Sequence, residues 1–172
     1  MKVMGVVGWK NSGKTGLVER LVSEIAGRGF SVSTIKHAHH GFDLDQPGRD
    51  SFRHREAGAR EVLIASARRW ALMHELDEEE EPGVEELMAQ LTPVDLVIIE
   101  GFKREGHMRI EAHRSETRKT LLAEEDEGII AVASDEPVEA AVPLFALDDT
   151  GAIADFVLQR VGLGPRGENG DV

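Results

Sequence analysis

A glycine-rich stretch near the N-terminus, GWKNSGKT, has the residue types and the spacing of a loop that binds phosphate groups. Gly8, Gly13, Lys14 and Thr15 match the pattern G-x-x-x-x-G-K-[ST] at every fixed position. Glycine lets backbone N–H groups turn towards an anion, and the N-terminus of a following helix adds partial positive charge. The lysine would reach the β- and γ-phosphates, and the threonine hydroxyl would bind Mg²⁺. The stretch therefore predicts a phosphate site. Lys10, in the same loop, could face either solvent or a phosphate.

A carboxylate is expected near such a magnesium ion, and two candidates flank the apolar run LVII. Asp95 and Glu100 would lie about 16 Å apart along a strand, so only one of them can reach the ligand. In parallel sheets, ligands bind outside the carboxyl ends of the strands. This rule selects Glu100 and leaves Asp95 as a solvated residue at the strand entry. Glu100 could contact the metal through water or act as a base, and Gly101 would let the chain turn close to the phosphates.

The stretch KHAHHGFDLDQPGRDSFRHREAGA combines histidines, aspartates and arginines in a predicted loop. His37, His39 and His40 resemble metal ligands, although no cysteine is present to complete a site. Asp43 and Asp45 would share one face if the chain were extended. Because the loop follows a predicted strand, these residues could contact phosphates, Mg²⁺ or a second ligand, and an ordinary solvated loop is the alternative. The further candidates in this stretch are Lys36, Asp50 and Arg53.

The elements that would position these residues alternate between strand and helix. Residues 2–7 form an apolar run typical of a buried strand, a helical apolar pattern runs from Lys14 to the glycines at 27–29, and residues 30–35 complete a parallel strand–helix–strand unit. Further strands are predicted over residues 60–66, 69–76, 95–101, 107–114 and 128–134, and further helices over residues 50–59, 83–91 and 149–163. This alternation predicts an α/β fold with a mainly parallel sheet flanked by helices.

Several details of this organisation can be tested separately. We expect Asp50 or Ser51 to cap the second helix and Asp149 or Thr150 to cap the last one. Residues 60–76 are predicted to form a β-hairpin whose edge, with the apolar RWALM, could pair with another subunit. We expect one domain over residues 1–163 and a flexible tail over residues 164–172.

Composition narrows the functional classes. The net charge of −12 disfavours broad binding to nucleic acid, which needs many Lys and Arg side chains against phosphates. No apolar run approaches the roughly 20 residues that span a membrane. The 172 residues include no cysteine, so disulfides and thiolate chemistry are excluded. These features predict a globular protein of the cytoplasm.

Three stretches, GWKNSGKT, IKHAHHGFDLDQPGRDSFRHREAGA and DLVIIEGFK, occur in this order and together resemble the molybdopterin-guanine dinucleotide biosynthesis protein B (MobB) family. The resemblance covers roughly residues 2–135 and implies a P-loop NTPase fold, GTP binding with Mg²⁺, weak GTP hydrolysis at most, and a homodimer. It also implies an accessory role in attaching GMP to molybdopterin, with a MobA-type nucleotidyltransferase as partner. Whether molybdopterin itself binds here stays open.

The resemblance also implies roles for individual residues. Phosphate contacts are implied for Gly8, Asn11, Ser12, Gly13, Lys14 and Thr15, and a catalytic and metal-binding role for Glu100. Within the family's central motif, His37 is a candidate for the nucleotide and Asp43 for Mg²⁺. The guanine signature N-K-x-D is missing. In AVASDEP, however, Asp135 follows a predicted buried strand, where its carboxylate could accept from the guanine N1 and N2 donors; the alternative is a turn aspartate before Pro137.

Two other functions remain compatible with the sequence alone. A small-molecule kinase would use the same phosphate loop together with an arginine-rich lid, which the segment from Arg49 to Arg69 could imitate. A metal chaperone would instead use His37, His39 and His40 of the predicted loop over residues 36–50, the central loop.

Overall fold

The computed structural model describes residues 1–38, 45–76, 80–102 and 105–164. The chain divides into two compact units, Met1–His37 with Leu87–Val172 and Ala38–Glu86. Three residues of the central loop considered above, His39, His40 and Asp43, lie outside the described residues, as does the tail from residue 165 onwards.

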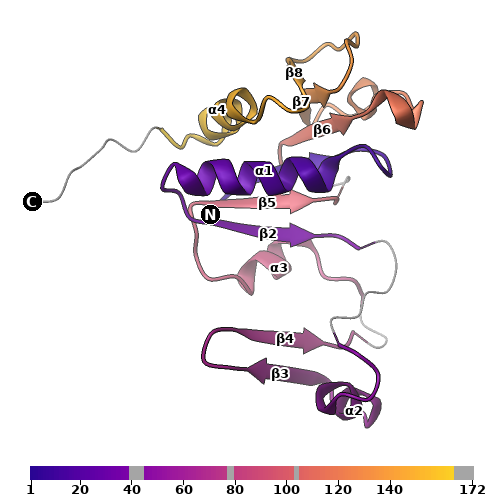
Figure 1. Cartoon of the computed structure of the whole chain (residues 1–172), viewed down its shortest axis with the longest axis vertical. Helices are drawn as coiled ribbons and strands as arrows, with labels where there is room; N and C mark the ends of the chain where they lie inside the picture. Colours follow the sequence, from indigo (N-terminus) through magenta and orange to yellow (C-terminus); the bar gives the residue numbers. More distant parts are fainter. Residues whose placement is uncertain (39–44, 77–79, 103–104, 165–172) are drawn as a thin grey trace, which may run out of the picture. The chain divides into compact units, whose positions relative to one another are not determined.

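Within the described residues, the larger unit is built on a six-stranded sheet in the order β2-β5-β1-β6-β7-β8, and all its neighbouring strands are parallel (Figure 1). The strands are β1 (Lys2–Val7), β2 (Val32–Lys36), β5 (Leu96–Glu100), β6 (Arg109–His113), β7 (Ile129–Ser134) and β8 (Leu144–Ala146). The predicted α/β fold is confirmed, and β8 is an added strand that the sequence did not indicate. Because β1 lies between β5 and β6, the residues that follow these three strands meet at one edge of the sheet.

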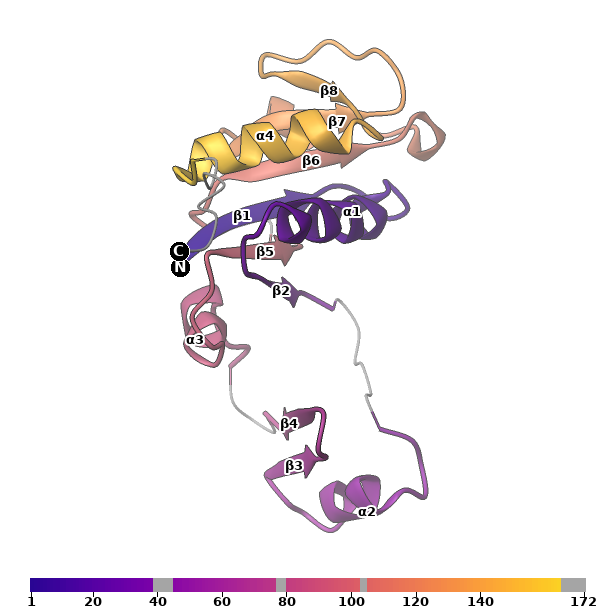
Figure 2. The same cartoon turned by 60° about the vertical axis from the view of Figure 1, so that its left-hand side comes forward.

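Helices α1 (Lys14–Gly27) and α4 (Thr150–Val161) lie side by side on one face of this sheet (Figure 2). Both bury apolar residues at helical spacing, and in α1 these are Leu17, Val18, Leu21 and Ile25. Asp149 is the N-cap of α4, where its side chain accepts from the N–H of Ala152 at 3.1 Å, and Gly162 ends the helix with a φ of 73°. The predicted start of α1 and the predicted cap of α4 are therefore confirmed.

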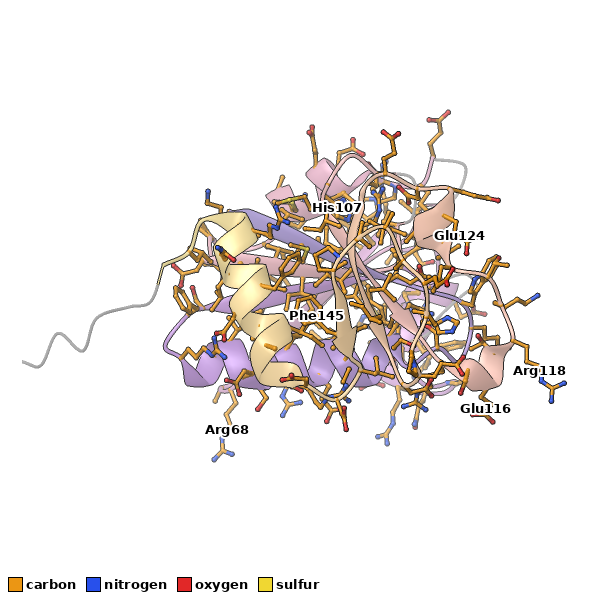
Figure 3. The ribbon with its side chains drawn as sticks, turned by 90° about the horizontal axis from the view of Figure 1, so that it is seen from above. Arg68, His107, Glu116, Arg118, Glu124 and Phe145 are labelled. Carbon is orange, nitrogen blue, oxygen red and sulfur yellow. The ribbon has the colours of Figure 1, made fainter. Side chains whose placement is uncertain are left out.

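The connection between β6 and β7 contains the short 3₁₀ turns η1 (Ser115–Thr117) and η2 (Leu122–Glu124), of which η2 lies on the opposite face of the sheet (Figure 3). Glu111, fully buried on β6, accepts from the backbone N–H groups of Leu122 and Ala123 at 2.9 Å each, and burial raises the pKa of this carboxyl. Arg109 pairs with Asp126 at 2.7 Å. Figure 3 shows Glu124 and His107 on the side of the sheet away from α1. Buried polar groups of β6 thus hold this connection in place.

The smaller unit contains α2 (Asp50–Glu56) and an antiparallel hairpin of β3 (Glu61–Ala65) and β4 (Trp70–His74). The hairpin confirms the prediction for residues 60–76. The boundary between the two units falls within α3 (Val84–Ala89), which lies inside the predicted helix over residues 83–91. Within the described residues, none of the helices is both long enough and apolar enough to cross a membrane.

The predicted cap of α2 is wrong. Arg49 is the N-cap, without a side-chain hydrogen bond, and Asp50 is already the first helical residue. The Ser51 hydroxyl donates instead to Asp45 Oδ1 at 2.9 Å, and Asp45 Oδ2 lies 3.8 Å from Arg55 Nε. Asp50 and Ser51 therefore lie inside the helix and not at its N-cap, and the Ser51 hydroxyl binds a carboxylate outside the helix, a contact that holds Asp45 within its own unit.

Candidate functional site

The loop between β1 and α1 has a shape that requires glycine at both ends. Gly8 has a φ of 149° and Gly13 a φ of 90°, conformations that L side chains rarely adopt. A Cβ on Gly8 would lie 2.4 Å from the carbonyl oxygen of Ala112 and 2.4 Å from Ser12 Oγ. Asn11, with a φ of 65°, supplies a further left-handed residue. These bends wrap the loop around a small space at the start of α1.

Several donors converge on that space. Helix α1 begins at Lys14 without a side-chain cap, so its first N–H groups are available to a ligand. Ser12 Oγ is buried and makes no hydrogen bond within the described residues. Lys14 Nζ donates to the carbonyl oxygen of Trp9 at 2.7 Å, which keeps the ammonium group over the loop. An orphaned hydroxyl beside an uncapped helix N-terminus fits the chemistry of a phosphate group.

The carboxylate of Glu100 lies beside this loop. Glu100 is the last residue of β5 and is buried, and its Oε1 accepts from Thr15 Oγ1 at 2.8 Å. Lys36 Nζ, at the end of β2, lies 3.4 Å from the same oxygen. Asp95 is at the other end of β5, where it accepts from the N–H and the hydroxyl of Ser31 at 2.7 and 2.6 Å. Strand direction thus separates the two acids as expected, and Glu100 is the one near Thr15.

The hydroxyl of Thr15 and the carboxylate of Glu100 are both oxygen ligands of the kind that Mg²⁺ prefers. No group of three or more His, Asp or Glu side chains converges within the part of the chain that the structure describes. A magnesium ion at this pair would therefore take its other ligands from phosphates and water, as it usually does in nucleotide sites. The residues present fit that role.

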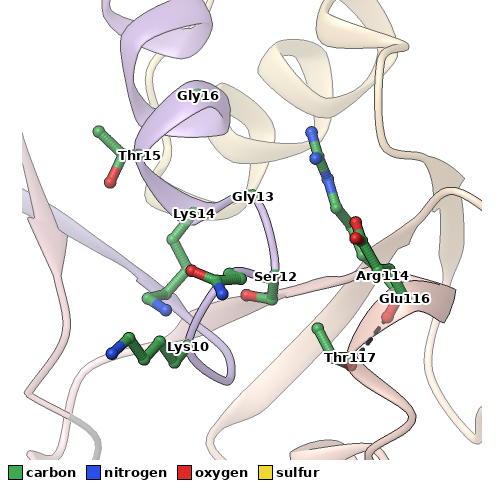
Figure 4. A pocket seen from close by; sticks show the side chains of 10 residues that line it. Lys10, Ser12, Gly13, Lys14, Thr15, Gly16, Arg114, Glu116 and Thr117 are labelled. Atoms are coloured by element: carbon green, nitrogen blue, oxygen red, sulfur yellow. Dashed lines mark hydrogen bonds between the residues drawn. The ribbon is translucent and has the colours of Figure 1, made fainter.

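A pocket of about 710 Å³ opens over the loop (Figure 4). Its walls are residues 10–16 together with Arg114, Glu116 and Thr117 from the connection after β6. Lys10 is exposed and lines this pocket, so it faces the space over the loop as well as solvent. The described lining carries Lys10, Lys14 and Arg114 against Glu116, a local excess of positive charge in a chain whose net charge is −12. Such an excess favours an anionic ligand.

The connection after β6 is attached directly to the loop. Trp9 Nε1 donates to the carbonyl oxygen of Thr120 at 2.8 Å, and Lys119 Nζ lies 5.6 Å from the centre of the Trp9 ring. The sequence indicated neither this attachment nor a role for Arg114, Glu116 and Thr117. An arginine at the end of a predicted strand was the available signal, but the position of that strand beside β1 could not be read from the sequence.

Two other predicted site residues lie at the same edge of the sheet. The N–H of His37 donates to the carbonyl oxygen of Glu100 at 2.9 Å, and its ring packs against Phe102 with ring centres 4.6 Å apart. Asp135 follows β7, and its Oδ1 accepts from the N–H of Ser115 at 2.8 Å. The structure therefore brings His37 to the end of β5 and Asp135 to the connection that lines the pocket.

A parallel sheet, a glycine-bounded phosphate loop between its central strand and α1, and an acid at the end of the adjacent strand define an α/β protein of the P-loop NTPase-like class. The family model described as "Molybdopterin guanine dinucleotide synthesis protein B" matches residues 3–135. The chain belongs to this family, MobB, and the resemblance inferred from the three sequence stretches is confirmed.

Named relatives agree with the family model. The chain is 37% identical over 165 residues to the molybdopterin-guanine dinucleotide biosynthesis adapter protein of Escherichia coli (strain K12), covering 91% of each chain. It is 40% identical over 158 residues to the adapter protein of the same name from Haemophilus influenzae, covering 90% of this chain and 86% of the relative. A solved structure of molybdopterin-guanine biosynthesis protein B matches with a TM-score of 0.73 and 30% identity, over 92% of this chain and 99% of that one.

Proposed function

We propose that this protein is a cytoplasmic GTP-binding accessory protein in the biosynthesis of molybdopterin guanine dinucleotide. Membership of the MobB family and the adapter names of its relatives support the pathway. The observation that carries nucleotide binding is the 2.8 Å pair of Thr15 Oγ1 and Glu100 Oε1 beside the uncapped start of α1. In the proposal, this pair supplies two oxygen ligands for Mg²⁺ where a loop-bound phosphate chain would end.

In this proposal each residue of the loop has a binding task. The N–H groups at the start of α1 and the Ser12 hydroxyl donate to phosphate oxygens, and Lys14 exchanges the Trp9 carbonyl for a phosphate. Mg²⁺, held by Thr15 and Glu100, would supply positive charge to the phosphates. Because Glu100 is engaged with Thr15, it suits holding a metal better than activating water, and we expect GTP hydrolysis to be weak at most.

Glu100→Gln tests this assignment. We expect the variant to retain much of its GTP binding and to lose the residual hydrolysis. Asp95→Asn is the matched control, because it changes the acid at the opposite end of the same strand. Equal turnover in Glu100→Gln and wild type would remove the metal assignment.

Asp135 is proposed to select guanine. One of its oxygens accepts from the N–H of Ser115, which leaves Oδ2 to accept from the N1 and N2 donors of the base. Xanthine carries an oxygen where guanine has the N2 amine, so Asp135→Asn should shift the binding preference from GTP towards xanthosine triphosphate. An unchanged preference would discard this role.

A second copy of the chain is the partner we propose for the hairpin. Leu63 and Leu72 are directly paired across β3 and β4, and Trp70 lies on the same face; their exposures of 59%, 42% and 66% leave an apolar surface. A homodimer would cover this surface, and light scattering at micromolar concentration should report twice the mass of the chain. A monomer would contradict the proposal.

The accessory role is tested by a reconstituted assay. Labelled GTP, molybdopterin and a MobA-type nucleotidyltransferase are incubated with and without the protein, and attachment of GMP is measured. We expect stimulation by wild type and less by Lys14→Ala. Transfer of the terminal phosphate to a small-molecule acceptor, in the absence of the nucleotidyltransferase, would instead identify a kinase.

A further inference from the structure

Arg114 lies on the opposite side of the phosphate loop from the proposed magnesium site. It follows directly after β6, whereas Glu100 ends β5, and β1 separates these two strands. Figure 4 shows Thr15 and Arg114 on either side of the loop. Arg114 Nε lies 2.9 Å from the position that a Cβ would take on Gly13, so the guanidinium is close to the start of α1.

The backbone of Arg114 is held while its charge is left available. The carbonyl oxygen of Arg114 accepts from the N–H and the hydroxyl of Thr117 at 3.0 and 2.8 Å. The next residue, Ser115, donates its N–H to Asp135. Among the described residues, the exposed guanidinium makes no hydrogen bond or ion pair. The side chain is therefore anchored at its base and lines the pocket with unused donors.

The strand order gives the direction in which a nucleotide would lie. Thr15 and Glu100 mark the metal end on the β5 side, and Asp135 marks the guanine end on the β7 side. β6 lies between β1 and β7, so Arg114 stands between the base and the loop. This step rests on the proposed function, which assigns the two ends.

We propose that Arg114 binds the phosphate next to the nucleoside, the α-phosphate of a guanosine nucleotide. A guanidinium offers a planar pair of N–H donors to phosphate oxygens, a geometry that lysine cannot reproduce. An arginine on the terminal phosphate would distinguish GTP from GDP. Arg114, on the nucleoside side, contributes equally to the binding of GTP, GDP and GMP. Discrimination among the three ligands would come from the magnesium end of the site.

Binding of these three ligands to Arg114→Gln, Arg114→Lys and wild type tests the proposal, with GMP measured by competition against a fluorescent GDP. We expect Arg114→Gln to weaken all three by a similar factor of about 10-fold or more, since a charge-assisted hydrogen bond is lost. Arg114→Lys should recover only part of the affinity. Arg118→Gln is the matched control, because this exposed arginine lies in the same connection but does not line the pocket; we expect a change of less than about 2-fold.

Five results would overturn the assignment. Weaker GTP binding with unchanged GDP binding would place Arg114 on the γ-phosphate, and weaker GTP and GDP binding with unchanged GMP binding would place it on the β-phosphate. Equal losses in Arg114→Gln and Arg118→Gln would show a general effect of charge. If wild type binds the ligands and Arg114→Gln binds them with the same affinity, only the assignment of Arg114 is refuted. If wild type binds none of the three ligands, the proposed function falls and the assignment falls with it.

Discussion

Gly8→Ala changes one hydrogen into a methyl group at the point where β1 enters the phosphate loop. The added Cβ would lie 2.4 Å from the carbonyl oxygen of Ala112 and 2.4 Å from Ser12 Oγ, whereas real Cβ contacts essentially never fall below 3.0 Å. Ser12 could rotate, but the Ala112 carbonyl belongs to β6, which is hydrogen-bonded to β1 and β7. The clash with Ala112 can therefore be relieved only by moving the backbone at the loop entry or in β6.

The magnitude follows from two costs. An alanine at a φ of 149° carries a backbone penalty of about 1–3 kcal/mol. Overpacking of a well-packed site adds about 1–3 kcal/mol. We expect the free energy of unfolding to fall by about 2–6 kcal/mol, and nucleotide affinity to fall with it. Gly27→Ala is the matched control: Gly27 ends α1, has no atom within 4 Å of its added Cβ, and should gain up to about 1 kcal/mol.

Urea unfolding followed by circular dichroism measures both variants against wild type. Compared with wild type, the urea concentration at the midpoint of unfolding should be lower in Gly8→Ala and equal or higher in Gly27→Ala, although both variants carry the same chemical change. A Gly8→Ala protein as stable as wild type would refute the close packing of the loop against β6.

Three further predictions address binding, pH dependence and helix capping. Lys14→Ala should weaken GTP binding by roughly 10- to 150-fold, because a charge-assisted contact worth about 1.5–3 kcal/mol is lost. A wild-type affinity of the variant in calorimetry would contradict this prediction. Burial, reinforced by the positive charge of Arg109, lowers the pKa of His107. The unfolded chain then binds the extra proton, so the stability that neutral His107 contributes is present above about pH 6.5 and is lost as the pH falls. Between about pH 7 and pH 5, the free energy of unfolding should therefore fall less in His107→Gln than in wild type. Identical pH profiles of the two proteins in unfolding experiments would count against this prediction. Asp149→Ala removes the cap of α4 and should cost about 0.5–2 kcal/mol in urea unfolding, an effect that Asp148→Ala should not reproduce.

The phosphate loop and Glu100 could be located from the sequence because both depend on local rules. A glycine pattern between an apolar run and a helical pattern determines the loop, and strand direction decides between Asp95 and Glu100. Hydrogen bonds of Thr15 with Glu100 and of Asp95 with Ser31 agree with that choice. The roles of these residues in binding remain predictions.

Arg114 could not be located in the same way. Its place depends on the order of strands, and β6 pairs with β1 although about a hundred residues separate them in sequence. A single sequence shows which residues follow a strand, but not which strands are neighbours. The cap of α2 was misplaced because the helix already includes Asp50 and Ser51, and the Ser51 hydroxyl donates to Asp45 outside the helix.

Calorimetric titration of the full chain with GTP, at millimolar Mg²⁺ and again with a chelator, tests the central claim most directly. We predict uptake of GTP that is markedly tighter with Mg²⁺ present, and a Thr15→Val variant that has lost this difference. No detectable uptake of GTP or GDP by wild type, or an affinity that is the same with and without Mg²⁺, would contradict it.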